Sequence, residues 1–263
     1  MVRKSFKSGT KVQKFAHIQK FLYLCSVNNK HFWLQVVSTA LTVAAFGYLV
    51  YRLVTYDDYA AFARSFSTAD SVAWLCLVVA VVLLPVHLTV EAKRWQVLLQ
   101  GVAAVSLRAS LRQVLAGYLG AFVTPYRLGE YPARLLEAGL DTTTSLEWKN
   151  WRLWLKDWAK WGRFLLWTFI RYTIWGLQLW AVLRFCGISL TPLQAVCSIA
   201  VYYVLISIMP SLPAAEVPLK GGWAVLVFQH VTSNTPAIAS AVAIIWVVNT
   251  IFPVLFAGLR KKL

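Results

Sequence analysis

Long apolar runs constrain the fold of this chain more than any other feature of its sequence. The 263 residues are 59% hydrophobic and only 14% charged, whereas a soluble domain carries about 25% charged residues. Several runs approach or exceed the ~20 apolar residues that a helix needs to cross a bilayer. The clearest are residues 32–54, 72–90, 164–184, 192–209 and 236–259. Lipid has to solvate the apolar side chains that exceed what a soluble core can bury, so the sequence predicts an all-α polytopic membrane protein.

Basic residues lie in blocks beside these runs. The formal net charge is +16, and the blocks occupy residues 3–30, 93–112, 149–163 and 260–262. Blocks of this kind set membrane topology and contact anionic headgroups. Because none of them lies on a recognisable nucleic-acid-binding module, we expect no nucleic-acid partner.

The same blocks predict the orientation of the chain. Residues 1–31 contain basic residues and no acidic ones, whereas the loop after the first run carries Asp57, Asp58 and Asp70. The positive-inside rule then places the N-terminal segment in the cytoplasm. Six crossings return the basic tail, residues 260–263, to the same side. We expect a bacterial inner-membrane protein with both termini cytoplasmic.

We predict one transmembrane domain over residues 32–259, with six to eight membrane segments that include re-entrant or broken helices. Residues 128–140 are predicted to be re-entrant, because the apolar run before them, residues 114–123, reaches only about halfway across the hydrocarbon. A pair of short tilted helices fits the same pattern. The approximate segments are residues 32–54, 72–90, 107–124, 128–140, 147–163, 164–184, 192–209, 222–231 and 236–259.

Tryptophans recur at three- and four-residue steps between residues 147 and 163, a spacing that places them on one helical face. Lysine and arginine occupy the other faces. This pattern predicts a helix that lies flat at the headgroup boundary, where tryptophan is favoured. The alternative is that the stripe packs on neighbouring helices. The tryptophans are Trp148, Trp151, Trp154, Trp158 and Trp161.

Two proline-containing segments interrupt the apolar pattern at predicted membrane depth. Each holds a Glu-x-Pro element, Glu130-Tyr131-Pro132 in the first half and Glu216-Val217-Pro218 in the second. Paired interruptions in two halves indicate a transport site in repeat-built transporters. The match therefore predicts a two-half pseudo-repeat, unless so short a match is coincidental. The residues predicted to break the helices are Pro125, Gly129, Pro132, Pro210, Pro213 and Pro218.

Charged side chains accompany both interruptions. Such side chains cost about 2.5–3.5 kcal/mol each at the bilayer centre on insertion scales, so they normally face a partner or a polar path. Arginine offers a fork of donors that suits phosphate. We predict a lipid-headgroup site; the alternative is that the first three candidates only neutralise one another at i+3 and i+4. The candidates are Arg127, Glu130, Arg134, Glu216 and Lys220.

Arg171 lies near the middle of the apolar run 164–184. Because a charged side chain at membrane depth is unfavourable without a partner, we predict that Arg171 has an intramembrane charge partner. That partner would be Glu130, Glu137 or Glu216. Alternatively, the side chain snorkels to the interface beside Tyr172.

No catalytic constellation is recognisable in the sequence. We find no Ser/His/Asp arrangement, P-loop, GxGxxG or HExxH motif. The ten acidic residues are scattered, and the four cysteines lack metal-ligand spacing. We therefore predict no catalytic residues, no metal site and no cofactor, and a transporter is favoured over an enzyme.

Residues 124–134, Thr-Pro-Tyr-Arg-Leu-Gly-Glu-Tyr-Pro-Ala-Arg, resemble the T-P-x-R-x-G-E-[YF]-x-x-R signature of the lysylphosphatidylglycerol synthase transmembrane region family. Two further elements agree in order, Lys93-Arg94-Trp95 and Met209-Pro210 with the later Glu216 and Lys220-Gly221. The resemblance covers roughly residues 40–258. It implies a flippase-like domain that moves an amphipathic lipid between leaflets. It also implies that the lipid path lies near Pro125, Arg127, Gly129, Glu130 and Arg134.

The resemblance also sets limits. In aminoacyl-phospholipid synthases of this family a soluble synthetase domain follows the membrane domain, whereas this chain ends at Leu263. We therefore expect a free-standing member without lysyl transfer. Ala214 and Ala215 stand where many relatives have glycine, which weakens the second interruption as a half-site.

The leading hypothesis is a translocase for a membrane lipid or a lipid-linked precursor. The expected partner is an anionic phospholipid or another phosphate-bearing lipid. One alternative is a non-catalytic accessory or scaffold subunit of an envelope lipid or glycan biosynthesis system. Another is a membrane transferase with a lipid-linked donor. A homo-oligomer and an envelope-biosynthesis partner are further open expectations.

Overall fold

The computed structural model describes residues 29–67, 70–100, 103–124, 127–140, 157–208 and 216–260, and every regular element in these ranges is a helix. The predicted all-α class is confirmed for this part of the chain. Two helical stretches, Ser71–Leu99 and Thr235–Leu259, are long and apolar enough to cross a membrane. The number of crossings stays a prediction. Most of the N-terminal segment and the tail from residue 261 lie outside the described residues.

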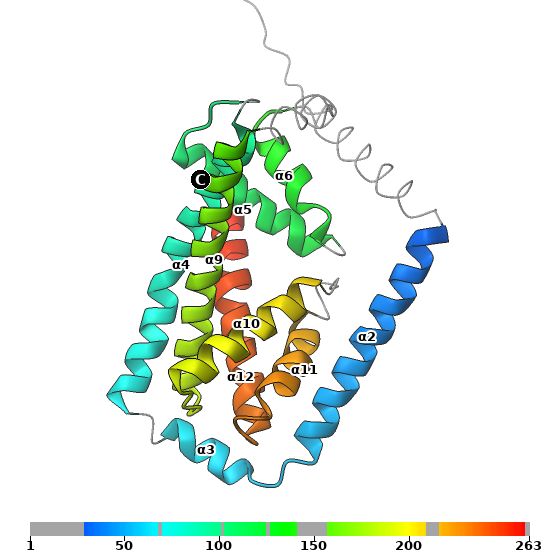
Figure 1. Ribbon diagram of the computed structural model, residues 1–263, viewed down its shortest axis with the longest axis vertical. Coiled ribbons are helices and arrows are strands. Elements are labelled where there is room, and N and C mark those ends of the chain that lie inside the picture. Colours follow the sequence, from blue (N-terminus) through cyan, green and yellow to red (C-terminus); the bar gives the residue numbers. More distant parts are fainter. Residues whose placement is uncertain are drawn as a thin grey trace, which may run out of the picture.

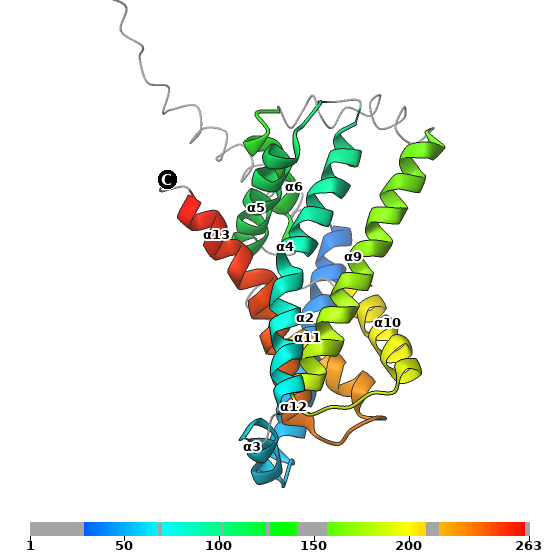
Figure 2. The same cartoon turned by 90° about the vertical axis from the view of Figure 1, so that its left-hand side faces the viewer.

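The longest helical segments follow the long axis of the molecule (Figure 1). A shorter helix, α3 (Tyr59–Ser67), follows α2 and lies at the end of the molecule opposite the C-terminus (Figure 2). The long segments are α2 (Asn29–Val54), α4 (Ser71–Leu99), α9 (Trp158–Phe185) and the continuous run of α12 (Thr235–Trp246), η3 (Val247–Ile251) and α13 (Phe252–Arg260).

α4 continues beyond the predicted end at residue 90. Its N-terminus is capped by Asp70, whose carboxylate accepts a hydrogen bond from the Ala73 amide at 2.8 Å. No glycine or second proline interrupts the chain before Leu99, so the helix continues through Arg94 and Trp95. Two charged side chains, Glu91 and Arg94, are thereby carried inside the helix, where they need partners from other helices.

α9 begins earlier than predicted. Asp157 caps it by accepting hydrogen bonds from the Ala159 and Lys160 amides. Trp158 and Trp161 therefore belong to the same helix as Arg171, and no boundary separates residues 158–163 from the segment predicted to start at 164. The other tryptophans of the predicted interfacial helix lie outside the described residues.

α4 and α9 are antiparallel neighbours. The rings of Trp74 and Phe185 meet at one end of the pair, with centroids 5.2 Å apart. Further along, Gln178 Nε2 donates to the Ala80 carbonyl at 2.9 Å. These contacts advance in opposite directions along the two helices, which brings Arg171 towards the later turns of α4.

α5 (Leu107–Val123) and α6 (Glu130–Glu137) form an antiparallel hairpin. Two glycines of α5 allow the close approach. A Cβ at Gly120 would lie 2.3 Å from the Gly129 carbonyl oxygen, and a Cβ at Gly117 would lie 2.6 Å from Arg134 Nε. Because only glycine leaves this space, α6 packs directly on the backbone of α5.

α10 (Pro192–Ile208) and α11 (Glu216–Phe228) follow α9 as α5 and α6 follow α4. The α5–α6 hairpin lies towards the end of the molecule that holds the C-terminus, and α10 and α11 lie towards the other end (Figures 1 and 2). Each helix of the second set begins 85 to 87 residues after its counterpart: Ser71 and Trp158, Leu107 and Pro192, Glu130 and Glu216.

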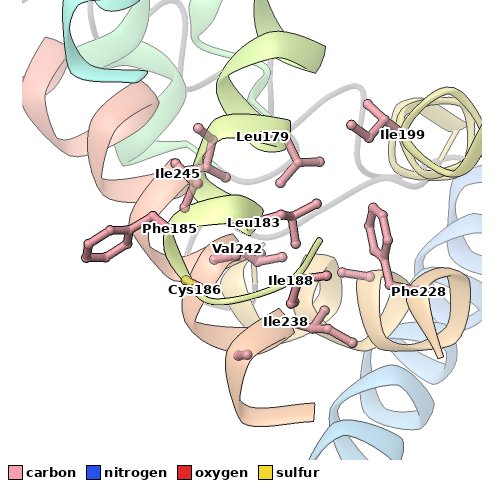
Figure 3. Close-up of a cluster of buried hydrophobic side chains, with 14 of the residues drawn as sticks. Leu179, Leu183, Phe185, Cys186, Ile188, Ile199, Phe228, Ile238, Val242 and Ile245 are labelled. Carbon is pink, nitrogen blue, oxygen red and sulfur yellow. The ribbon is translucent and has the colours of Figure 1, made fainter. Parts of the chain in front are cut away.

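Two apolar clusters hold these helices together. The larger joins α4, α9, α10, α11 and α12, with Leu179, Leu183, Phe228 and Val242 among its fully buried side chains (Figure 3). The smaller is formed by the last turns of α4 with α5 and α6, around Trp95. The first turns of α4 belong to the larger cluster and its last turns to the smaller one, so the two clusters follow each other along this helix.

α2 packs mainly on α11. The contact is close at Gly222, where a Cβ would lie 2.5 Å from the Ala45 carbonyl oxygen. Tyr48 on α2 donates a hydrogen bond to Gln229 Oε1 at 2.8 Å. Much of α2 is otherwise apolar and exposed, as Val43 and Phe46 show, which suits a helix in contact with lipid.

Candidate functional site

A layer of charged side chains lies between the two apolar clusters. On α4 it starts at Glu91, after Ala80 of the larger cluster and directly before Ala92 of the smaller one. Ion pairs connect every member of the layer, which we call the charge layer. Its members are Glu91, Arg94, Arg127, Glu130, Arg134, Arg171, Glu216 and Lys220.

Glu91 is the carboxylate with the most partners in this layer. Its Oε1 accepts a hydrogen bond from Arg134 Nη2 at 3.0 Å, and its Oε2 accepts one from Arg94 Nη1 at 3.3 Å. Arg171 Nε lies 3.2 Å from Oε2 but is not aligned for a hydrogen bond. The Glu91 side chain is only 4% exposed. A carboxylate so deeply buried requires charged partners, and here three arginines surround it.

Arg134 connects Glu91 to the α5–α6 hairpin. The same Nη2 also donates to Glu130 Oε1, one turn earlier in α6. The guanidinium carbon lies 5.3 Å from the centre of the Trp95 ring, within the range of a cation–π contact. Gly117 leaves room for the side chain, which is 3% exposed. Arg134 is therefore held in one position by two carboxylates and an aromatic ring.

Arg127 joins the two halves of the chain. It precedes α6, and its Nε donates to Glu130 Oε2 at 3.1 Å while its Nη1 lies 3.7 Å from Glu216 Oε1. Its φ of 56° lies in the left-handed region, which costs a non-glycine residue roughly 1–2 kcal/mol. Strain of this kind concentrates at functional sites. The conformation directs the guanidinium of Arg127 between the first residues of α6 and α11.

Glu216 completes the layer on the other side. Lys220 donates to its Oε1 at 2.6 Å from one turn further along α11. Trp246, the last residue of α12, donates from its indole to Glu216 Oε2 at 3.0 Å. Glu216 and Lys220 therefore repeat the spacing of Glu130 and Arg134, 86 residues later in the chain.

The charged candidates from the sequence all lie in this one layer. The two interruptions meet there through Arg127, which contacts both Glu130 and Glu216. The prolines differ from expectation. Pro132 and Pro218 each occupy the third residue of a helix, α6 and α11, and so start helices rather than break them. Gly129 directly precedes α6. Pro125, Pro210 and Pro213 lie outside the described residues.

Arg171 has a partner that the sequence did not indicate. It pairs with Glu91, and not with Glu130, Glu137 or Glu216 as predicted. Its guanidinium also lies over the ring of Trp175, with 4.1 Å between the guanidinium carbon and the ring centre. The side chain therefore points towards α4 rather than to the interface.

Sequence reasoning missed Glu91, Arg94 and Trp246. One signal for the first two was present: Glu91 and Arg94 have the i,i+3 spacing of a helical ion pair. Ending the predicted helix at residue 90 placed them in a loop. Trp246 gave no signal, because its contact with Glu216 spans 30 residues and depends on tertiary packing.

His87 is also buried beside the layer. It lies one turn before Glu91 in α4, is 0% exposed, and neither ring nitrogen has a hydrogen-bond partner. Its ring contacts Trp175, with centroids 5.3 Å apart. Within the described residues no group of three His, Cys, Asp or Glu side chains is placed to hold a metal ion.

Residues 35–146 match the family model of the lysylphosphatidylglycerol synthase TM region. Over these residues the chain is similar to that family. The matched part of the chain includes Glu91, Arg94, Arg127, Glu130 and Arg134, whereas the rest of the charge layer lies beyond residue 146. Searches of curated proteins and of solved structures give no match. The family indicates a membrane protein concerned with lipids.

Proposed function

We propose that this chain is a flippase-like translocase, which moves a membrane lipid or a lipid-linked precursor between the two leaflets. The cargo carries phosphate, and its headgroup passes through the charge layer. Five cations and three carboxylates, buried or partly buried between two apolar clusters, carry this proposal. Charge in an apolar interior is costly, and charged side chains within membrane segments mark substrate and ion pathways.

The arrangement of helices supports the proposal. α4, α5 and α6 are followed by α9, α10 and α11 in the same order, and the two short-helix pairs lie in opposite halves of the long axis (Figure 1). We propose that the two sets are an inverted pseudo-repeat. In transporters with such repeats the substrate site lies where interrupted helices of the two halves meet. Here that place is the contact of Arg127 with Glu130 and Glu216.

The position of the first residues of α6 and α11 is consistent with phosphate binding. Each helix begins with a glutamate, Glu130 or Glu216, and each carries a cation four residues later. A helix N-terminus presents unpaired N–H groups and a partial positive charge. An anionic headgroup can replace one of these glutamates as the partner of Arg127 without leaving a cation unpaired. We propose this exchange of anions as the binding step.

Reconstituted vesicles provide the test. Purified protein is inserted into vesicles with a fluorescent phosphate-bearing lipid, and the rate at which this lipid reaches the other leaflet is measured. Arg127→Ala and Glu130→Gln should each reduce the rate at least tenfold. Arg64→Ala, which removes an exposed arginine on α3, should leave it unchanged. Wild-type rates in both site variants, with normal insertion, would refute the proposed site.

The same preparation separates the alternatives. A wild-type protein that moves no lipid, but co-purifies with an envelope-biosynthesis enzyme, would support an accessory subunit instead. Product formed from a lipid-linked donor in detergent would support a transferase.

A further inference from the structure

The charge layer has an unequal number of charges. Its carboxylates are Glu91, Glu130 and Glu216, and its cations are Arg94, Arg127, Arg134, Arg171 and Lys220. The ion pairs therefore leave an excess of two positive charges. The cations of the layer are buried or only partly exposed, and a charge withdrawn from water without a counterion is unfavourable, so this excess calls for an anion that the described residues of the layer do not supply.

We infer that the charge layer selects a lipid whose headgroup carries two negative charges, such as a phosphomonoester or a diphosphate, over one that carries a single charge. The inference rests on the proposed function and deepens it, because it names the class of headgroup. A phosphomonoester approaches two negative charges above neutral pH, since its second pKa is near 6. A phosphodiester headgroup such as that of phosphatidylglycerol carries only one. Only the first kind neutralises the layer completely.

The exposure of the cations indicates where the headgroup enters. Arg127 and Lys220 are the most exposed members of the layer, at 35% and 26% of their side chains, whereas Arg134 is 3% exposed. Both flank Glu216, from opposite halves of the chain. A phosphate that arrives between them meets two cations and displaces only the weaker contact, the 3.7 Å pair between Arg127 and Glu216.

The unused donors support the same conclusion. Arg127 directs Nε and Nη1 at carboxylates, and its second terminal nitrogen carries two further N–H groups. Deeper in the layer, Arg134 Nε is buried without a hydrogen-bond partner. A buried donor of this kind costs about 1–3 kcal/mol or more. The layer is thus short of acceptors as well as of negative charge, and a headgroup phosphate supplies both.

The ligand is a lipid rather than a free phosphate because of what surrounds the layer. The helices beside it present apolar side chains outwards, such as Val123 on α5 and Phe169 on α9. An acyl or prenyl chain can remain among these side chains while its headgroup reaches Arg127. Inorganic phosphate gains nothing from these surfaces.

Binding to the purified full chain in nanodiscs at pH 8 tests the inference. The probes are phosphatidic acid, a phosphomonoester lipid, and phosphatidylglycerol, each diluted in phosphatidylcholine, with inorganic phosphate as a soluble competitor. We expect phosphatidic acid to bind at least tenfold more tightly than phosphatidylglycerol. We also expect millimolar inorganic phosphate not to compete with it. Inorganic phosphate that binds as tightly as phosphatidic acid and displaces it would overturn the assignment of the ligand to a lipid.

Variants that change the charge excess make the test specific. Lys220→Gln and Arg127→Gln each reduce the excess of positive charge in the layer from two to one. Either change should bring the affinities for phosphatidic acid and phosphatidylglycerol within about threefold of each other. Arg64→Gln on α3 keeps the layer intact and should keep the tenfold preference. Thermal unfolding of each variant checks that it is folded. A preference that persists in both folded site variants would overturn the charge argument, as would equal affinities in the wild type.

The outcome also separates this inference from the proposed function. Translocation of both lipids at equal rates would contradict the preference for two charges and leave the translocase standing. Tight binding of phosphatidic acid without movement of either lipid would contradict the translocase and leave the headgroup site standing.

Discussion

Glu91 accepts contacts from three arginines that arrive from three helices: Arg94 in α4 itself, Arg134 in α6 and Arg171 in α9. No other carboxylate of the charge layer has three arginine partners. Because Glu91 is buried, water cannot take the place of its carboxylate as the partner of these arginines. We therefore consider Glu91 the structural centre of the layer, whereas the more exposed Arg127 is the residue that meets the cargo.

Glu91→Gln should destabilise the protein strongly. The change keeps the shape of the side chain but leaves the buried Arg134 and the partly buried Arg94 and Arg171 without their common counterion, and loss of one partner from a buried ion pair costs about 3–5 kcal/mol. We expect the thermal unfolding midpoint in detergent to fall by roughly 10 °C. Glu137→Gln, at an exposed residue of α6, should change it little. Equal midpoints for the two variants would contradict the role of Glu91.

Gly117→Ala should displace Arg134. The added methyl group would lie 2.6 Å from Arg134 Nε, and the two carboxylates that hold the guanidinium prevent it from moving aside freely. Overpacking of this kind costs about 1–3 kcal/mol. Both lipid translocation and the unfolding midpoint should decrease. Gly47→Ala on α2 is the matched control, because nothing lies within 4 Å of its Cβ. A fully active Gly117→Ala variant would show that the position of Arg134 does not matter.

At the scale of elements, the two short-helix pairs differ in how tightly they pack. α6 contacts the backbone of α5 through Gly117 and Gly120, whereas α10 and α11 contact each other through side chains such as Tyr202 and Phe228. α11 makes its backbone-to-backbone contact with α2 instead, at Gly222. In the α10–α11 pair, α11 therefore packs its backbone against α2 rather than against α10.

Gly222→Ala should loosen α2 from the rest of the molecule. Its Cβ would lie 2.5 Å from the Ala45 carbonyl oxygen, and backbone cannot move aside as a side-chain end can. We expect a lower unfolding midpoint and loss of the Tyr48–Gln229 hydrogen bond, visible as faster proteolysis of the α2–α3 loop. Gly258→Ala on α13, with nothing within 4 Å of its Cβ, should behave as the wild type. Equal proteolysis of both variants would contradict the packing of α2 on α11.

Local spacing is enough to predict the ion pairs that lie within one helix. Glu130 with Arg134, and Glu216 with Lys220, stand four residues apart, so a single helix is enough to pair them. The contact of Arg134 with Glu91 spans 43 residues and needs the packing of α6 on α4. The helical role of Pro132 and Pro218 was missed for a related reason. Proline fits the first turn of a helix as well as it ends one, and only the fold decides between the two.

For the whole molecule, the orientation in the membrane remains our prediction. α3 lies at one end of the long axis, and the C-terminus and the end of α6 lie at the other (Figures 1 and 2). The acidic residues of the α2–α3 loop, Asp57 and Asp58, are at the first end, and the start of α9, which carries Lys160 and Arg163, is at the second (Figure 2). The positive-inside rule then assigns the second end to the cytoplasm.

Cysteine labelling in intact cells measures this orientation. In a variant without the native cysteines, Asp57→Cys in the α2–α3 loop should react with a membrane-impermeant maleimide added outside the inner membrane. Glu137→Cys at the end of α6 should react only after the membrane is permeabilised. The reverse pattern would invert the predicted topology.

The central claim is that a phosphate-bearing headgroup enters the charge layer between the two halves. An experimental map of the protein in nanodiscs that contain phosphatidic acid tests it most directly. We predict density for a lipid phosphate within hydrogen-bond distance of Arg127 and Lys220, with its tail among the apolar side chains outside the layer. Lipid phosphates found only at the ends of the long helices, with Arg127 still bound to Glu130 and Glu216, would contradict the account.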